Sequence, residues 1–291
     1  MSRGRITKLA YNGWTTGANT KIRELKGFFD MPDLRTADVD LSGMDGVLFG
    51  TDEMGKKVIE ATFVSYGDGL SGSAGDHDQI SDEIDDLVST FQVQADDTLP
   101  LDATFKNALE EETVLTVFCR PRKRPIPLSP KDGGFSIETV VTLEAEDPRI
   151  YGPLMTQTVG MAGGAEVGRT YPRVYPWTYG EGGAGGTIDA HNSGSAKSYP
   201  VAYIHGPCDT PRLTHQELNR FVKVNLTLVA GDTLVIDFFH RTITIQGMSR
   251  YYALTNDSDW FWLDPGSNSI QFLGSYYDPL ATVTIAWRSA D

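Results

Sequence analysis

Apolar and polar residues alternate on both sides of a polar group in residues 231–247, GDTLVIDFFHRTITIQG. Alternation of β-branched and aromatic residues at every second position predicts two β-strands. Asp237, His240 and Arg241 then lie where the chain reverses, and a solvated turn accounts for them without any chemistry. We therefore predict a hairpin here rather than an active site.

The same alternation continues through the last hundred residues of the chain. Short apolar runs such as SYPVAYIHG, NSIQFLG and ATVTIAWR are separated by glycine and proline turns. Many short strands at close, regular spacing predict an antiparallel β-sandwich. The chain shows no alternation of strands with long helices and no glycine-rich phosphate loop, which argues against a parallel nucleotide-binding sheet.

The first half of the chain is also predicted to be mainly β, with one helix. Residues 6–63 break into short apolar pieces typical of strands joined by tight turns, and residues 113–120 and 135–144 are further predicted strands. Between them, apolar residues recur at helical spacing over residues 78–92, with Asp76 or Asp78 as the N-cap. Acidic residues occupy the other side of this helix, where we expect a solvated face.

A sharp change of composition separates the two halves. Residues 152–187 are rich in glycine, proline and tyrosine and predict a connector. Its aromatic residues, Tyr171, Tyr175, Trp177 and Tyr179, indicate that part of it packs on a domain surface. We therefore expect an N-terminal β domain over residues 1–151 and a C-terminal sandwich over residues 188–291.

The charge of the chain limits its function. Among 291 residues, 25 are Lys or Arg and 39 are Asp or Glu, a formal net charge of −14. Such a surface repels DNA and argues against a sequence-independent grip on its phosphates. The one dense basic cluster, RPRKRP at residues 120–125, is interpreted as a solvated loop at a strand end. Without a signal sequence or an apolar run of ~20 residues, we expect a soluble product made in the cytoplasm, with no membrane partner.

Motifs for catalysis and for metal or cofactor binding are not found. The histidines and the two cysteines have no zinc-ligand spacing, and no GxSxG motif occurs. We expect no catalytic residue, no cofactor and two reduced or buried thiols. The many acidic residues and the β pattern are the sole motive for considering a glycoside hydrolase or another cell-wall enzyme.

One aromatic cluster is a candidate for sugar binding, because aromatic rings stack on sugars. Its members are Tyr251, Tyr252, Trp260 and Trp262. The alternative is that the aromatics within residues 256–268, NDSDWFWLDPGSN, fill the sandwich core while Asp264, Pro265 and Gly266 form a turn. We favour the core interpretation.

Several motifs follow one another in an order that resembles a known family. They are Asn192-x-Gly194, Tyr199-Pro200, Gly206-Pro207, Gly231-Asp232, Ile236-Asp237, Arg241-Thr242, Gly247 and Leu263-x-Pro-Gly266-x-Asn268, preceded by Asp147-Pro148, Tyr151 and the YPRVYP connector. From about residue 135 onward the chain resembles the distal tail or minor tail proteins of long-tailed phages.

The resemblance implies a virion protein at the distal end of the tail. It implies an N-terminal domain that assembles into a ring, usually a hexamer, on the tail tube, and a C-terminal galectin-like sandwich. The implied partners are other copies of the chain, the tail tube protein, and tip, baseplate-hub or receptor-binding proteins, with DNA only passing through the channel. The alternative function is a carbohydrate-binding module of a tail adsorption apparatus.

Overall fold

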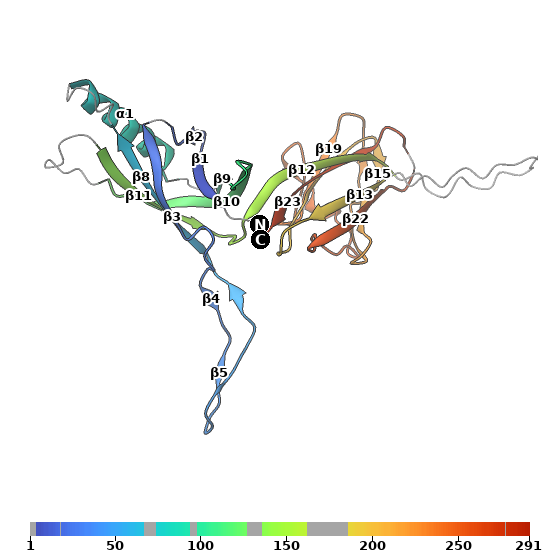
Figure 1. The fold of residues 1–291 in the computed structure, drawn as a ribbon. Helices are drawn as coiled ribbons and strands as arrows, with labels where there is room; N and C mark the ends of the chain where they lie inside the picture. The colour runs from blue at the N-terminus through green and yellow to red at the C-terminus, as the bar shows by residue number, and fades with distance from the viewer. Residues whose placement is uncertain are drawn as a thin grey trace, which may run out of the picture. The chain divides into compact units, whose positions relative to one another are not determined.

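The chain folds into strands with one α-helix among the residues that the structure describes (Figure 1). The computed structural model describes residues 4–17, 19–66, 74–93, 98–126, 136–161, 186–276 and 278–291, with the side chains of 74–79 excepted. Two compact units, Met1–Tyr151 and Gly152–Asp291, divide the chain. The predicted mainly-β class is confirmed.

Two sets of antiparallel strands form the body of the first unit, and one long strand belongs to both sets. Strand β10 (Glu112–Lys123) pairs through its first part with β9, and through Arg120, Pro121 and Lys123 with β11. The remaining pairs are β9–β1, β1–β2, β11–β8 and β8–β3. The bounds are β1 Arg5–Tyr11, β2 Trp14–Thr15, β3 Thr20–Lys26, β8 Lys57–Tyr66, β9 Leu99–Lys106 and β11 Ser136–Ala145. By passing from one set of strands to the other, β10 joins them around a common core.

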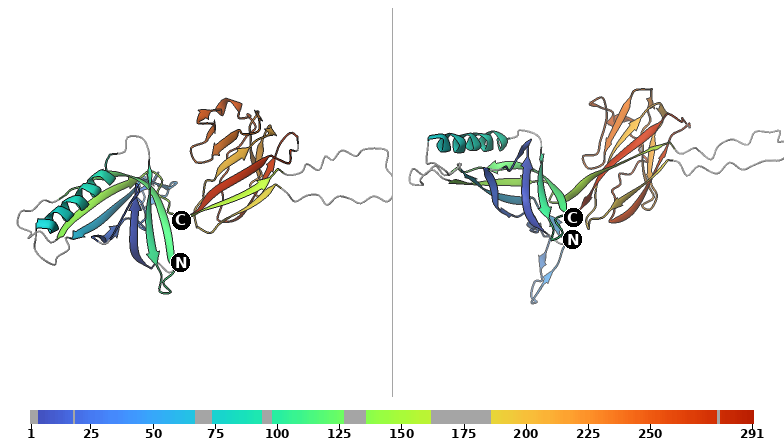
Figure 2. Two further views of the ribbon diagram at one scale, coloured as in Figure 1. Left: turned by 90° about the horizontal axis from the view of Figure 1, so that it is seen from above. Right: turned by 45° about the horizontal axis from the view of Figure 1, so that its top comes forward.

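Helix α1 (Ala74–Thr90) lies along these strands in both views of Figure 2. Leu87 and Phe91 are buried in the core of the unit, as their helical spacing predicts. The predicted N-cap is wrong, because the helix begins at Ala74 and so contains both Asp76 and Asp78. Acidic residues suit the first turns of a helix as well as its cap, so their presence alone does not fix its start.

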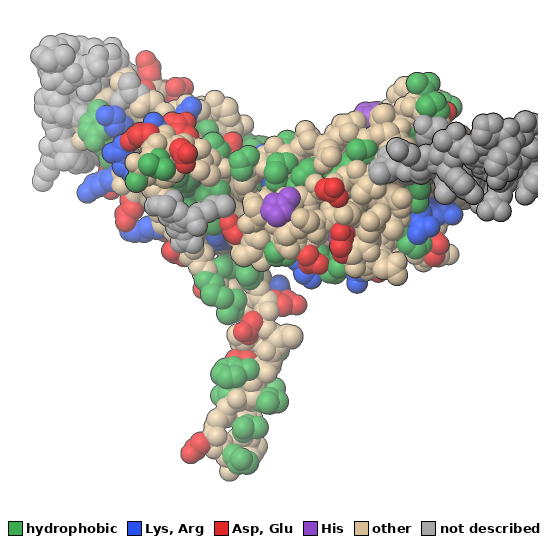
Figure 3. All heavy atoms as spheres, turned by 45° about the vertical axis from the view of Figure 1, so that its right-hand side comes forward, with side chains coloured by type: hydrophobic (Ala, Val, Ile, Leu, Met, Phe, Trp, Pro, Cys, Tyr) green, Lys and Arg blue, Asp and Glu red, His purple; other side chains and the backbone are tan. Residues whose placement is uncertain are grey.

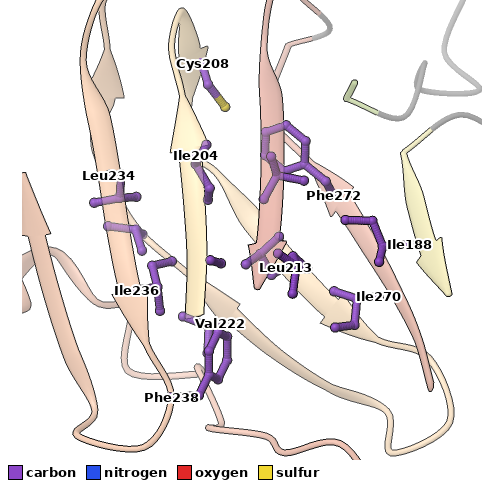
Figure 4. Packing of buried hydrophobic residues seen from close by; sticks show 14 of the residues in the cluster. Ile188, Ile204, Cys208, Leu213, Val222, Leu234, Ile236, Phe238, Ile270 and Phe272 are labelled. Carbon is purple, nitrogen blue, oxygen red and sulfur yellow. The ribbon is translucent and has the colours of Figure 1, made fainter. Parts of the chain in front are cut away.

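Two facing sheets form the second unit. One has the order β12 (Tyr151–Gly160), β23 (Thr282–Ala290), β14 (Val201–His205), β19 (Thr233–Asp237), β20 (Thr242–Ile245) and β21 (Met248–Ser249). The other has the order β13 (Thr187–Asn192), β22 (Gly266–Leu273), β16 (Arg212–His215) and β17 (Arg220–Lys223). A short pair, β15 (Cys208–Asp209) and β18 (Thr227–Leu228), and a 3-10 helix, η1 (Tyr251–Ala253), complete the unit. Side chains such as Leu234, Ile236 and Phe272 pack between the strands (Figure 4).

The beginning of the predicted connector is a strand. Residues 152–160 lie in β12, which neighbours β23 in the sheet, and Thr158 and Thr284 share a hydrogen bond of 2.8 Å between their hydroxyls. Met161 is buried in the core of the second unit, and Met155 and Val159 pack against that core. Pairing with a strand more than a hundred residues away is what makes this segment regular. The rest of the predicted connector, with Tyr171, Tyr175, Trp177 and Tyr179, lies outside the described residues.

Candidate interaction surfaces

The polar group of residues 231–247 forms a closed turn. Strands β19 and β20 pair with Asp237 opposite Thr242, so the hairpin prediction is confirmed. One oxygen of Asp237 accepts hydrogen bonds from the backbone N–H groups of Phe239 and His240 at 2.8 and 2.9 Å. The other oxygen lies 2.8 Å from Nδ1 of His240, and Arg241 takes a φ of 54°. Asp237 and His240 thus hold the chain reversal, and Arg241 is the residue in it with left-handed backbone geometry.

The four aromatic candidates for sugar binding have different surroundings. Trp260 packs edge-on against Phe238, with 5.6 Å between ring centroids, as the core interpretation expected. The ring of Trp262 has the Lys197 ammonium 3.9 Å from its centroid, and its indole N–H donates to Asp264. Tyr251 and Tyr252 are exposed on η1. Sugar binding by these residues stays a prediction.

Residues 120–123 of the basic cluster lie in a strand, and only Arg124 and Pro125 lie beyond its end. Strand β10 continues to Lys123, and the arginines have acidic or backbone partners. Arg120 pairs with Glu146 at 2.7 Å and Arg122 with Glu144 at 3.2 Å, while Arg124 donates to carbonyl groups at the end of helix α1. The loop prediction was wrong for residues 120–123 because it treated the prolines as strand breakers, whereas Pro121 lies at an irregularity of the β10–β11 register. Neutralised in this way, the cluster is a poor phosphate site.

Metal and thiol chemistry have little basis in the described part of the chain. There, no group of three or more His, Cys, Asp or Glu side chains could hold a metal ion. Cys119 and Cys208 are free and buried, as expected, and burial raises the pKa of each thiol to about 12. A thiol that stays protonated at neutral pH is a poor nucleophile. None of the described helices is long and apolar enough to cross a membrane.

A projecting hairpin is the most unusual feature of the first unit. Two short ladders build it, β4 (Leu34–Arg35) with β7 (Glu53–Met54) and β5 (Val39–Asp40) with β6 (Val47–Leu48). We call residues 31–55 the arm. Figure 1 shows it extending away from the strands of its unit, and Figure 3 shows apolar and acidic side chains along it.

Apolar side chains of the arm lie in solvent. Every residue from Asp33 to Met54 is exposed, including Met44 at 73%, Leu48 at 63% and Phe49 at 85%. The large exposed apolar residues are Met31, Leu34, Val39, Leu41, Met44, Val47, Leu48, Phe49 and Met54. Isolated hairpins are at best marginally stable in water, and a contiguous exposed apolar surface usually marks an interaction site. The arm therefore has the character of half an interface.

The acidic charge of the arm favours a partner with basic groups. The arm contains six acidic residues, Asp33, Asp38, Asp40, Asp45, Asp52 and Glu53, and one basic residue, Arg35, which pairs with Glu53 at 3.1 Å. A partner with basic groups beside an apolar groove would complement it.

The root of the arm is firmly anchored. Lys57, which is buried, donates from Nζ to the carbonyl oxygen of Phe28 at 2.9 Å. Burial lowers the pKa of this lysine, and the charges of Asp30 and Asp147 oppose the shift. Gly27 takes a φ of 77°, and a Cβ there would lie 2.0 Å from the carbonyl oxygen of Val58, so only glycine fits. The arm thus leaves the body of its unit at a defined place.

The arm was not predicted from the sequence. Residues 6–63 were predicted to be strands joined by tight turns, which holds for the pairing but not for the burial. Alternation of apolar and polar residues has the same appearance whether the apolar side meets its own core or another molecule. The signal that was available is the dense mixture of acids and large apolar residues around the turn SGMDG.

Known proteins with the same organisation are phage tail components. Residues 193–290 match the profile of the family described as "Siphovirus-type tail component, C-terminal domain". The distal tail protein of Bacillus phage SPP1 is 26% identical over 265 residues, which cover 91% of this chain and 90% of that protein.

Two solved structures share the fold over nearly the whole chain. The crystal structure of the SPP1 Dit protein, described as a paradigm of the hub of adsorption apparatuses in phages of Gram-positive hosts, matches 98% of both chains with a TM-score of 0.61 and 16% identity. A chain in the activated, calcium-containing baseplate of phage P2 matches 96% of both chains with a TM-score of 0.52 and 11% identity. Each of the two units therefore has a counterpart of similar fold in these structures.

Proposed function

We propose that the chain is a member of the siphovirus distal tail protein (Dit) family and that identical copies of it close into a ring at the end of the tail tube. As a family member it is a distal component of the phage tail and its baseplate hub, a structural protein rather than an enzyme. The proposed ring has six copies. It joins the tail tube protein to the tip, hub or receptor-binding proteins and lets DNA pass.

The arm is the observation that carries the proposal. It exposes large apolar side chains on a hairpin whose root is fixed, and it has little core of its own. In a closed ring each copy can give one arm and accept another, so one pair of complementary surfaces serves every interface. A second copy of the chain is accordingly the partner that we assign to the arm.

The negative charge supports the DNA-passage part of the proposal. With a formal charge of −14, copies around a channel would repel the phosphates of passing DNA rather than hold them. This fits a conduit and argues against a DNA-binding protein.

Ring assembly can be tested with the purified full-length chain by light scattering after size exclusion, followed by negative-stain electron microscopy. We expect a mass about six times 31.9 kDa and ring-shaped particles. Leu48→Asp with Phe49→Asp should release monomers, because losing the centre of an apolar interface costs more than about 2 kcal/mol, or roughly 30-fold in affinity.

The matched control replaces two exposed apolar residues outside the arm, Met248→Asp with Tyr252→Asp. Rings that survive the control but not the arm variant assign the interface to the arm. A wild-type chain that stays monomeric at every concentration and salt would overturn self-assembly. Rings that persist in the arm variant would keep the ring and reject the arm as its contact.

A further inference from the structure

The outer face of the β13–β22–β16–β17 sheet carries a polar row that crosses all four strands. Leu213, Val222 and Ile270 point into the core (Figure 4), so the residues that alternate with them face the other way. In register, Thr187 pairs with Gln271, Gln271 with Thr214, and Thr214 with Phe221. The row therefore consists of a hydroxyl, an amide and a second hydroxyl, followed by the aromatic ring of Phe221.

Two cations stand next to this row. Arg212 and Lys223 are directly opposite each other on β16 and β17, an arrangement that costs stability because like charges meet across a ladder. The guanidinium of Arg212 lies 3.9 Å from the centroid of the Phe221 ring. Among the described residues, neither cationic side chain has a hydrogen-bond or ion-pair partner. Their charge is thus available to a ligand.

Two polar atoms of the same face are buried without a partner. They are Nε of Arg212 and Oγ1 of Thr214, which lie two residues apart on β16. Buried polar groups are nearly always hydrogen-bonded, so such atoms call for an explanation. Both atoms are covered by neighbouring groups, so a bound molecule would supply the missing partners by displacing those groups.

The acidic side chains around the face differ in their hydrogen-bond partners. At the β13 end, Asp189 accepts from the Ser269 hydroxyl at 3.0 Å and Glu217 accepts from the Ser269 backbone N–H. At the β17 end, the pKa of the exposed Asp257 is lowered, mainly by a hydrogen bond from the Thr255 side chain, with Lys223 and Arg212 adding attraction. In the part of the chain that the structure describes, no carboxylate makes an ion pair with either cation, so the basic end can still take an anion.

We propose that this outer face binds an acidic saccharide, with its carboxylate at Arg212 and Lys223 and its hydroxyls at Thr187, Thr214 and Gln271. Arginine suits carboxylates because its planar fork can donate two parallel hydrogen bonds. Hydroxyl and amide groups both donate and accept, as sugar hydroxyls require, and the Phe221 ring offers an apolar edge to C–H groups. An acidic peptide would pair with the two cations but would have no hydroxyl groups to bind the polar row. This proposal does not rest on the proposed ring.

Calorimetric titration of the full-length chain with trigalacturonate tests the site. Maltotriose is the neutral saccharide for comparison, and triglutamate is the acidic ligand without sugar hydroxyls. About 150 mM salt should screen the overall negative charge beyond roughly 8 Å while leaving the contact pairs in place. We expect trigalacturonate to bind at least tenfold more tightly than either comparison ligand.

Variants separate the two parts of the site. Arg212→Gln with Lys223→Gln should weaken trigalacturonate binding at least tenfold, and Gln271→Ala several-fold, with unchanged circular dichroism. Arg241→Gln with Arg250→Gln removes the same charge from the unit elsewhere and should leave binding as it is. Absence of binding at millimolar trigalacturonate, equal binding of triglutamate, or full binding by the Arg212/Lys223 variant would each overturn the proposal.

Discussion

At the scale of one residue, Asn268 shows which contacts can be predicted from the sequence and which cannot. The run LDPGSN was interpreted as a turn, and the turn is present, but its stability comes from Asn268, which is 2% exposed. Its side-chain oxygen accepts from the backbone N–H of Asp264 at 2.9 Å and lies 3.1 Å from Nε2 of the buried His215. Nδ1 of the same ring lies 3.2 Å from the Leu218 backbone nitrogen and 3.3 Å from a carboxylate oxygen of Glu217, so the imidazole is held on both sides. The turn is local and predictable, while a partner 53 residues away is not.

Replacing Asn268 should therefore destabilise the second unit. The Asn268 amide also donates to the carbonyl oxygens of Ala190, Asp264 and Gly266. Asn268→Ala leaves several buried polar groups unpaired, and we expect a loss of about 2–4 kcal/mol in the free energy of unfolding. Urea unfolding followed by tryptophan fluorescence measures it, with the exposed neighbour Ser267→Ala as the control. A loss below about 0.5 kcal/mol would mean that water replaces these bonds.

At the scale of elements, the sequence predicts type better than burial. The helix was placed at 78–92 and is Ala74–Thr90, and the strands placed at 113–120 and 135–144 are Glu112–Lys123 and Ser136–Ala145. Periodicity reports which residues share a face, so these elements were found. It does not report what the face meets, which is why the arm was taken for ordinary strands. The end of the helix likewise depends on a distant residue, since its last turn contains no basic side chain.

We predict that Arg124 is the distant residue that stabilises the end of helix α1. Its Nη1 donates to the carbonyl oxygens of Leu87 and Phe91, each at 3.4 Å, and to that of Val88. A cation at a helix C-terminus satisfies orphan carbonyls and favours the helix dipole. We expect Arg124→Met to cost about 1–2 kcal/mol locally, so that amide exchange over residues 84–91 accelerates roughly tenfold. Arg122→Met, which removes an exposed pair with Glu144, is the control, and equal protection in both variants would contradict the capping role.

At the scale of the whole molecule, composition predicted two units but not where the second one begins. Residues 152–187 have the glycine and proline content of a connector, and the sandwich was predicted to start at residue 188. The structure instead gives the second unit an edge strand, β12, from the start of that segment. Its partner β23 lies at the far end of the chain, and the pairing of such distant segments leaves no local signature. Composition averages over a segment and so hides a strand at one end of it.

This boundary can be tested with two fragments, residues 152–291 and residues 188–291. The longer one keeps β12, with Met155, Val159 and the buried Met161 against the core. The shorter one loses these contacts and bares β23 as a new sheet edge, which invites aggregation. Burial of three apolar side chains contributes roughly 3 kcal/mol or more, so the longer fragment should unfold at clearly higher urea and remain monomeric. Val159→Asp in the longer fragment is the matched control, expected to fall between the two. Equal stability of the fragments would show that β12 is an appendage and that the sandwich is complete from residue 188 onward.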